Sequence, residues 1–406
     1  MLAAMLALSG LVAGQAEQAV AQTDPLAACA EALANYTPVV GTDRYPTPDD
    51  LPLPPVREAY IDPAFGTCVV RVTDRRNDFD SPQVGLKNEY SRVQAFNADE
   101  SLIMVRGVEG DWFLYDAPSL APIQRLEAGV SIDEPRWDAQ NPLRFIFSPW
   151  ADGLPQLWAV TLTGRGPDAA AEAGLVHDFS GELPPEWNAM FVWRRWEGSP
   201  SNDSRYDAFM AEDGDFITRG LVSYDWQTDQ ILGLYSVPHG EVNEPDNVGM
   251  SPSGTYVMAQ FECCPEGQLG TYEEPCGAMV YTRDLTQGWG ISRCIGHNDM
   301  TFDAQGREVI VHQETTTDQI VMTDLATGET TALLDLDFST GVYGLHISGR
   351  AFDRPGWVAV SVHPEAPSLD FENPFWMVGT VFALELAPNP RVVQLAHHHS
   401  IRGQTE

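Results

Sequence analysis

The chain has 406 residues, and its 58 acidic side chains outnumber 23 basic ones, which gives a formal net charge of −35 at pH 7. Nucleic acid and anionic membrane surfaces are therefore disfavoured as partners, because binding to either needs a basic face. A hydrophobic fraction of 43% supplies a sizeable core and excludes wholesale disorder.

The first 21 residues are typical of a secretory signal. Residues 2–12 are mostly apolar, and Ala19, Val20 and Ala21 form a small-residue cleavage site. An ordinary buried helix is the alternative. No later stretch approaches the roughly 20 apolar residues that a membrane span needs. We therefore expect residues 1–21 to be a signal peptide, and the protein to be secreted or periplasmic without a membrane span.

Residues 22–55 form a Pro-rich N-terminal segment, and the proline run at 42–57 predicts an extended linker or a strap on a domain surface. Cys29 and Cys68 flank its proline run, and the other four cysteines crowd into one region: Cys263, Cys264, Cys276 and Cys294. Exported chains favour disulfides, and Cys263 and Cys264 are adjacent rather than spaced like a zinc-binding pair. We therefore predict disulfides rather than a zinc site, with the pairing left open.

From residue 56 to 406 the sequence indicates an all-β domain. Short runs rich in Val, Ile, Phe, Tyr and Trp alternate with turns of Gly, Asp, Asn and Pro. Similar hairpin turns recur near residues 97, 138, 202, 252, 303 and 353. Repeats of roughly 40–50 residues with four strands each are typical of a β-propeller with WD40-like units. A pair of β-sandwiches is the alternative, but it would not give one recurring four-strand period.

Six four-stranded blades are countable, and the closure of the ring leaves two possibilities. Residues 67–74 form a lone strand ahead of the first full unit, of the kind that completes the last blade of many propellers. The protein is then either a six-bladed ring or an incomplete seven-bladed ring whose chain stops inside the seventh blade. We favour the second possibility.

In a propeller, the loop that leads into the innermost strand of each blade lines one mouth of the central channel. In every unit these loops carry Asp, Glu or His, and one of them also carries an arginine: Glu89, Glu134, Arg136, Glu197, Glu244, Asp246, His297, Asp299, His346, His398 and His399. Convergent polar groups of this kind predict a polar pocket on the channel axis.

Histidines stand at equivalent positions in the last units, namely His297, His346 and the run at 397–399. Neutral imidazoles from adjacent strands can meet on a divalent metal, with Asp299 or another carboxylate completing the shell. The alternative is that each histidine only hydrogen-bonds a neighbouring loop. Four further histidines, which lie in loops or mid-strand, are expected to be structural or exposed: His177, His239, His312 and His363.

Residues 90–400 resemble the secreted propellers of the oligogalacturonate lyase type and related polysaccharide lyases. The motifs that carry the resemblance are residues 296–299 (Gly-His-Asn-Asp), 345–349 (Leu-His-Ile-Ser-Gly) and 397–400 (His-His-His-Ser). The resemblance implies a channel-end metal, Mn²⁺ or Ca²⁺, that neutralises a uronate carboxylate while a base removes the α-proton. It implies His346 and the run at 397–399 as metal ligands, so our candidate ligands are His346, His398 and His399, with Asp299 as the carboxylate suggested by its position.

By the same resemblance His297 is the base or a further ligand, and His297 and Arg350 are the catalytic candidates. Arg136 and Arg350 lie near the channel loops and can bind a carboxylate in bidentate fashion. The expected partner is a polysaccharide. A non-catalytic propeller that binds a glycan or a protein is the alternative. Trp187, Trp193 and Trp196 can stack on sugar rings, although we expect them to pack within blades.

Overall fold

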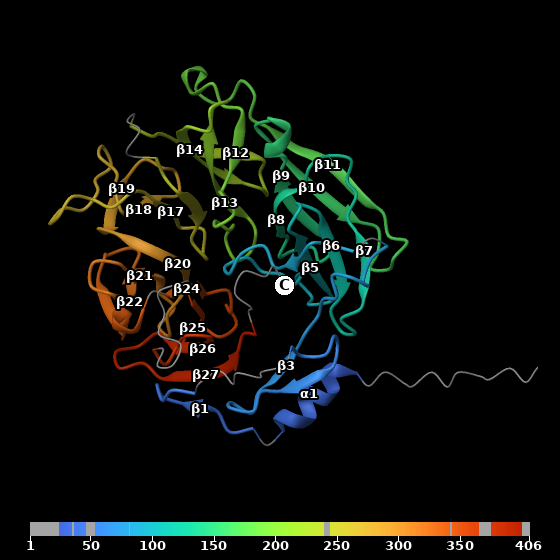
Figure 1. Cartoon of the computed structure of the whole chain (residues 1–406). Helices are drawn as coiled ribbons and strands as arrows, with labels where there is room; N and C mark the ends of the chain where they lie inside the picture. Colours follow the sequence, from blue (N-terminus) through green and yellow to red (C-terminus); the bar gives the residue numbers. More distant parts are fainter. Residues whose placement is uncertain are drawn as a thin grey trace, which may run out of the picture.

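The computed structural model describes residues 24–34, 36–45, 53–80, 82–238, 244–341, 343–364 and 375–399. The expected signal peptide at 1–21 and His239 lie outside the described residues. Six antiparallel four-stranded sheets surround a central channel, as Figure 1 shows. The prediction of an all-β propeller with six four-stranded blades is therefore confirmed, and the ring is six-bladed.

Each blade uses four consecutive strands, with the first strand innermost. The first three blades comprise β4 (Leu86–Lys87), β5 (Leu102–Gly107), β6 (Trp112–Asp116) and β7 (Pro122–Arg125); β8 (Asp133–Trp137), β9 (Arg144–Ser148), β10 (Gln156–Leu162) and β11 (Ala171–Asp178); β12 (Phe191–Trp193), β13 (Tyr206–Glu212), β14 (Thr218–Asp225) and β15 (Gln230–Ser236).

The last three blades follow the same order. They comprise β16 (Asn247–Met250), β17 (Tyr256–Gln260), β18 (Ala278–Thr282) and β19 (Gly288–Ser292); β20 (Ile295–Phe302), β21 (Glu308–Glu314), β22 (Gln319–Asp324) and β23 (Thr330–Asp335); β24 (Tyr343–Ser348), β25 (Trp357–Pro364), β26 (Thr380–Glu385) and β27 (Val392–His397).

The core lies between neighbouring blades. The second and third strands of a blade are apolar on both faces because each face packs against an adjacent blade. Val309, Val311, Ile320 and Met322, for example, pack against the apolar side chains of β24, β25 and β26. Outermost strands such as β11, β15 and β23 are more exposed, since only one of their faces is covered. This arrangement leaves the channel loops as the polar part of the ring.

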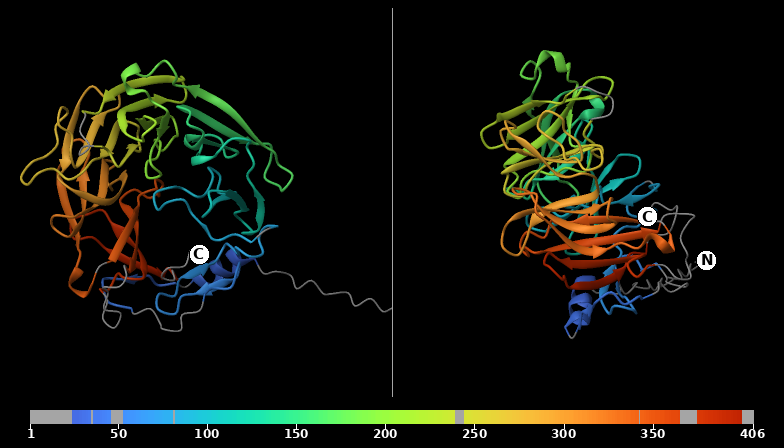
Figure 2. Two further views of the ribbon diagram at one scale, coloured as in Figure 1. Left: turned by 45° about the horizontal axis from the view of Figure 1, so that its top comes forward. Right: turned by 90° about the vertical axis from the view of Figure 1, so that its left-hand side faces the viewer.

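The N-terminal segment closes the ring. The hairpin of β2 (Ala59–Ile61) and β3 (Cys68–Val70) packs with the helix α1 (Pro25–Leu33) between the last and first blades, as Figure 2 shows. Asp62 accepts hydrogen bonds from the backbone N–H of His397 at 2.8 Å and from its ring Nδ1 at 3.0 Å. On the other side, Arg57 donates to the Leu120 carbonyl at 2.7 Å. The hairpin therefore bridges both ends of the six-bladed ring.

Two expectations for this segment need correction. The strand predicted at 67–74 does not complete the last blade; its central part, β3, pairs with β2 instead. The favoured prediction of an incomplete seven-bladed ring is also wrong, because six blades form the ring and the outer edge of the last one is paired by β1 (Val39–Val40) of the N-terminal segment. A two-residue pairing leaves little periodicity in a sequence, so β1 was not predictable from pattern alone.

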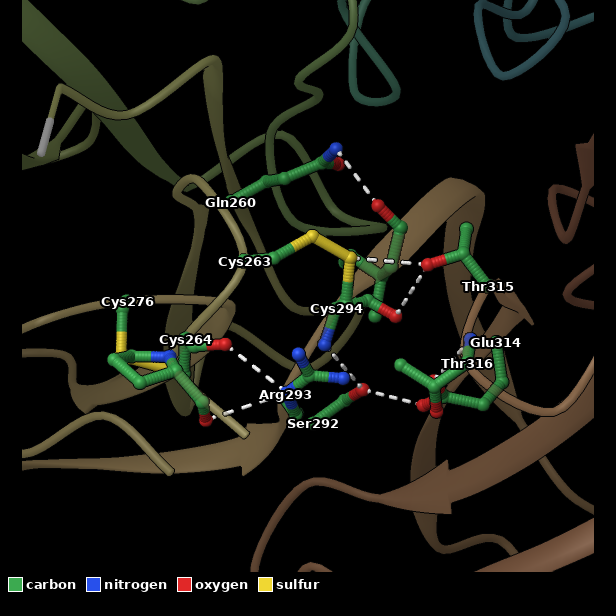
Figure 3. Close-up of a disulfide and its surroundings, with 12 residues drawn as sticks. Gln260, Cys263, Cys264, Cys276, Ser292, Arg293, Cys294, Glu314, Thr315 and Thr316 are labelled. Carbon is green, nitrogen blue, oxygen red and sulfur yellow. Dashed lines mark hydrogen bonds between the residues drawn. A yellow bond between two sulfur atoms is a disulfide. The ribbon is translucent and has the colours of Figure 1, made fainter. Parts of the chain in front are cut away.

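All six cysteines form disulfides, which confirms that prediction. Cys29 pairs with Cys68 and ties α1 to β3, with Cα atoms 5.4 Å apart. Cys263 pairs with Cys294 and Cys264 with Cys276, as Figure 3 shows. The first bond anchors the β17–β18 loop beside the start of β20, and the second closes a smaller ring within that loop. No helix in the described part of the chain is long and apolar enough to cross a membrane.

Candidate functional site at the leading mouth of the channel

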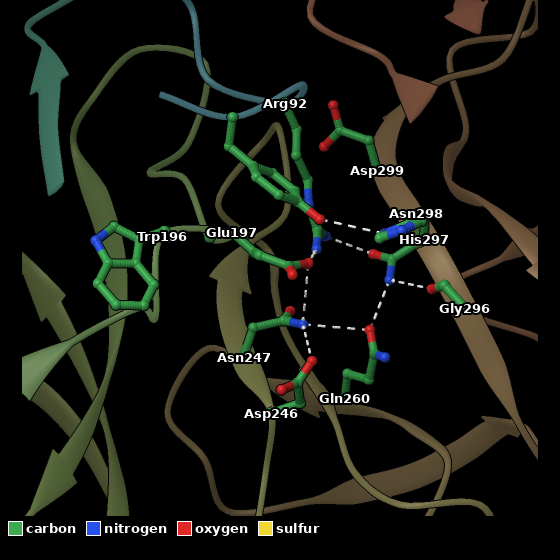
Figure 4. A network of polar contacts seen from close by, with 12 residues as sticks. Arg92, Trp196, Glu197, Asp246, Asn247, Gln260, Gly296, His297, Asn298 and Asp299 are labelled. Carbon is green, nitrogen blue, oxygen red and sulfur yellow. Dashed lines mark hydrogen bonds and ion pairs between the residues drawn. The ribbon is translucent and has the colours of Figure 1, made fainter. Parts of the chain in front are cut away.

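The innermost strands begin at one end of the channel, which we call the leading mouth. A layer of hydrogen bonds crosses the channel here, as Figure 4 shows. Arg92 forms an ion pair with Glu197 and donates from Nη1 to the Asn298 side-chain oxygen at 2.6 Å. Asn247 and Asn298 both donate to the Gln260 side-chain oxygen, at 3.2 and 2.8 Å. The layer joins blades that lie far apart in the sequence.

Arg92 is the centre of this layer. It is fully buried, and burial lowers the pKa of its guanidinium to about 10. Its Nε is buried without a hydrogen-bond partner among the described residues. The adjoining loop needs a glycine at position 198, because a Cβ there would overlap the Val248 carbonyl oxygen. Arg92 is thus a buried cation with one donor still to satisfy.

Aromatic and imidazole rings gather next to this layer. The Tyr90 hydroxyl lies 3.2 Å from Nδ1 of His297. The His297 and His346 rings have centroids 4.4 Å apart, and His363 stacks on His346 at 5.5 Å. Burial, together with the nearby charges of His297, His363 and Arg92, lowers the pKa of His346 to about 4. His346 is therefore neutral at pH 7.

Two of the expected residues meet here, and one position was misjudged. His297 and His346 come together as their equivalent positions predicted. His363, which we expected to be structural or exposed, belongs to the same row because β25 pairs directly with β24. His312 is buried mid-strand and contacts Thr323, and His177 contacts Asp229, so both are structural as predicted.

A cavity of about 420 Å³ opens beside the ring row, between the first and last blades. Its lining includes Lys87, Glu89, Tyr90, His346 and Ser348. Burial raises the pKa of Glu89 to about 7; Arg136 lowers it and Glu134 raises it. The cavity therefore combines the neutral His346 ring and the Tyr90 phenol with a carboxyl group whose pKa is raised to about 7.

The two expected carboxylate-binding arginines face a different cavity. Arg136 and Arg350 line a space of about 250 Å³ together with Phe96 and Phe352, among the turns at the opposite, trailing mouth. Arg350 donates from Nη2 to Asp299 at 2.8 Å. Both arginines already hold a carboxylate, and neither lines the cavity of Tyr90 and His346.

The remaining channel carboxylates have structural contacts. Glu134 is fully buried and accepts hydrogen bonds from the backbone N–H groups of Arg194 and Trp196. Glu244 accepts from the Thr218 N–H at 3.5 Å. Asp246 accepts from the Asn247 side chain at 3.5 Å, within the channel layer.

The expected metal ligands do not share one point. Asp299 is held by Arg350 and by the Gly349 N–H, both at 2.8 Å. His398 contacts the Val362 carbonyl, and the His399 ring packs against Tyr60. Within the described ranges there is no group of three or more His, Cys, Asp or Glu side chains placed to hold a metal ion. The donor set that the described residues provide does not fit the expected Mn²⁺ or Ca²⁺ site.

Tryptophans frame the other side of the leading mouth. Trp187 and Trp193 are core residues, as expected, whereas Trp196 is half-buried beside Glu197. Trp150 contacts Trp196 with ring centroids 6.1 Å apart. Trp150, Arg92 and Gln260 were not identified from the sequence. Trp150 and Gln260 lie outside the loops that lead into innermost strands, and Arg92 follows such a loop without a pattern that marks it.

Comparisons with known proteins support the fold. No protein-family model matches the chain, and no curated protein matches its sequence. An oligogalacturonate lyase from Vibrio parahaemolyticus has a similar structure, with a TM-score of 0.51 and 13% identity over 86% of this chain and 88% of that one. A post-proline cleaving enzyme from Rickettsia typhi has a TM-score of 0.46 and 10% identity over 77% and 45% of the two chains. The expected resemblance to the lyase-type propellers holds at the level of fold.

Proposed function

We propose that this protein cleaves a uronate-containing polysaccharide by β-elimination at the leading mouth. The observation that carries the proposal is the contact of Tyr90, His297 and His346 beside buried Arg92. Imidazole rings and a phenol supply groups that can accept and donate protons, and the guanidinium supplies a cation. The fold similarity to an oligogalacturonate lyase is consistent with this chemistry.

His297 is the base in this proposal. It takes the proton from the carbon next to the uronate carboxylate, and the electron pair of that C–H bond forms a carbon–carbon double bond. The bond between the adjacent carbon and the glycosidic oxygen breaks. The leaving oxygen takes a proton from the Tyr90 hydroxyl, which lies 3.2 Å from His297 Nδ1 and is reprotonated through it. One chain thus gives two, one of which ends in an unsaturated sugar.

Arg92 stabilises the charge that develops on the uronate carboxylate during proton removal. Its buried Nε donor and its position about 5.9 Å from the Tyr90 ring support this role. Glu89 lines the cavity next to Tyr90 and keeps its proton below about pH 7, so it does not repel an acidic sugar there. The catalytic role that we expected for Arg350 passes to Arg92, because Arg350 lines the other cavity.

No step of this mechanism runs through a metal, because the described donors do not converge. Metal assistance by Mn²⁺ or Ca²⁺ stays a prediction that the assay below tests directly. Secretion also belongs to the proposal, and it is supported by the three disulfides, which form and persist in oxidising compartments.

The test follows unsaturated product by ultraviolet absorbance during incubation with polygalacturonate or alginate, with EDTA and with added Mn²⁺ or Ca²⁺. We expect His297→Gln and Tyr90→Phe each to lower the rate by about 10²–10⁴-fold. His177→Gln, a histidine outside the channel, is the matched control and should retain the rate. Absence of product under every condition would reject the lyase and leave the alternative of a glycan- or protein-binding propeller.

A further inference from the structure

Two basic side chains lie side by side at the leading mouth. Lys87, the only lysine of the chain, is the direct cross-strand partner of Arg106 between β4 and β5. Directly opposed residues project from the same face of a sheet, and like charges there repel each other. Within the described part of the chain, neither side chain forms a salt bridge or a side-chain hydrogen bond, although acidic residues outnumber basic ones by 58 to 23.

Buried arginines elsewhere in the channel contrast with this pair. Arg92, Arg136 and Arg194 each hold a carboxylate. Arg106 lowers the pKa of the nearby Glu89 carboxyl, but that carboxyl accepts its hydrogen bond from Arg136. In a chain this acidic, a repulsive pair that forms no ion pair of its own indicates a site for an external anion. Lys87 also lines the cavity of Tyr90 and His346, which places the pair next to the proposed reacting groups.

A row of aromatic rings continues from Arg106. Its guanidinium carbon lies 5.9 Å from the centre of the Trp196 ring. Trp196 contacts Trp150 at 6.1 Å, and Trp150 contacts Phe216 at 6.4 Å. The Phe216 side chain is 46% exposed. We call Lys87, Arg106, Trp196, Trp150 and Phe216 the cation–aromatic row.

The backbone that carries the aromatic residues of this row is locally strained. Arg195, Trp196 and Phe216 have positive φ values of 53°, 61° and 61°. Bulky residues rarely adopt this conformation, and such strain concentrates at functional sites. The buried Glu134 carboxylate fixes Trp196 by accepting its backbone N–H. The fold therefore maintains an unfavourable backbone that presents Trp196 beside Arg106.

We infer that the cation–aromatic row binds an acidic polysaccharide chain that extends beyond the reacting unit. Lys87 and Arg106 hold a carboxylate or sulfate group, and Trp196 and Phe216 contact the apolar faces of neighbouring sugar rings. The inference rests on the proposed function for its substrate class. Because the whole protein carries −35, binding depends on these local contacts, and we expect it to strengthen once salt screens the long-range repulsion.

Binding rather than turnover tests the row. Affinity electrophoresis of the full chain is run in gels that contain polygalacturonate, a sulfated galactan or neutral dextran. We expect Arg106→Gln and Lys87→Gln each to weaken binding to the acidic polymer about tenfold, as for one lost charge-assisted hydrogen bond. Arg354→Gln removes the same charge at an exposed trailing-end turn and should leave binding unchanged. The acidic polymer that binds more tightly shows whether Lys87 and Arg106 prefer a carboxylate or a sulfate group.

A matched pair of variants tests the aromatic part of the row separately. Phe216→Ala should weaken binding several-fold, whereas Phe96→Ala, at a similarly exposed ring near the trailing mouth, should not. The inference would be wrong if Arg106→Gln and Arg354→Gln weakened binding to the acidic polymer equally. It would also be wrong if Arg106→Gln and Lys87→Gln both left binding unchanged. If the variants of the row lose binding but the wild type makes no unsaturated product, polysaccharide binding by the row is supported and the lyase activity is rejected. If product forms and the variants of the row bind normally, the lyase activity is supported and polysaccharide binding by the row is rejected.

Discussion

Arg136 donates from Nη1 to Glu89 Oε2 at 2.7 Å, and this buried ion pair separates the two cavities of the channel. Glu89 lines the cavity at the leading mouth, and Arg136 lines the one at the trailing mouth. Arg136 also donates to the carbonyls of Trp196 and Gly198. One guanidinium thus supports both the proposed proton-transfer cavity and the loop of the cation–aromatic row.

Removal of Arg136 should be strongly destabilising. Arg136→Met leaves a buried carboxyl group and two buried carbonyls without their donor, so we expect the free energy of unfolding to fall by about 3–5 kcal/mol. Urea denaturation followed by tryptophan fluorescence measures the loss. Arg144→Met, which breaks a partly exposed pair with Asp138, is the control and should cost about 1 kcal/mol or less. Similar losses in both variants would contradict the structural role of the buried pair.

Glu89→Gln should show a distinct pH dependence. Burial raises the pKa of Glu89 to about 7, so its contribution to stability is complete below pH 4.5 and is lost as the pH rises through 7. Glutamine does not titrate, and its oxygen still accepts from Arg136. The stability difference between wild type and Glu89→Gln should therefore shift in favour of the variant between pH 5 and pH 8, as measured by urea denaturation. A stability difference that stays constant over this range would show that Glu89 is charged throughout.

The repeat period was sufficient to predict the architecture, and the cysteine spacing was sufficient to predict disulfides. Equivalent positions in successive blades also brought His297 and His346 together correctly, because strand order fixes where each innermost strand begins. The charge partners were not predictable. Whether Arg350 faces substrate or Asp299 depends on side-chain direction at a channel that six blades share, and periodicity carries no information on it. The Lys87 and Arg106 pairing likewise depends on a register that only two residues of β4 define.

The disulfide between Cys263 and Cys294 should matter for activity as well as stability. Cys294 lies three residues before His297, and its bond holds the start of β20 against the β17–β18 loop. Cys263→Ala with Cys294→Ala opens a link of sequence separation 31 and should cost about 3–4 kcal/mol. Cys264→Ala with Cys276→Ala, of separation 12, is the matched control and should cost less. Thermal unfolding and the product assay check both; a larger activity loss in the control pair would contradict the argument.

Asp62→Asn should weaken the closure of the ring. Although burial raises the pKa of Asp62, its hydrogen bonds with His397 and Ala64 lower it overall, so the carboxylate stays charged at neutral pH. An amide keeps one acceptor but puts its N–H₂ group against the backbone N–H of His397 or the Ala64 N–H. We expect a loss of about 1–3 kcal/mol. Hydrogen exchange should rise first in β2, β3 and β27, and uniform acceleration across all six blades would argue against local opening.

His312 should make the protein less stable at mildly acidic pH. It is fully buried, its Nε2 lies 3.1 Å from the Thr323 hydroxyl, and burial lowers the pKa of its ring to about 4. The stability it contributes is complete above pH 6.5 and is lost as the pH falls through 4, because the unfolded chain binds the proton first. The loss over this window is about 3 kcal/mol. Urea denaturation from pH 7 to pH 4.5 should therefore show a shallower pH dependence for His312→Gln than for His177→Gln. Equal slopes would mean that the acid sensitivity arises elsewhere in the chain.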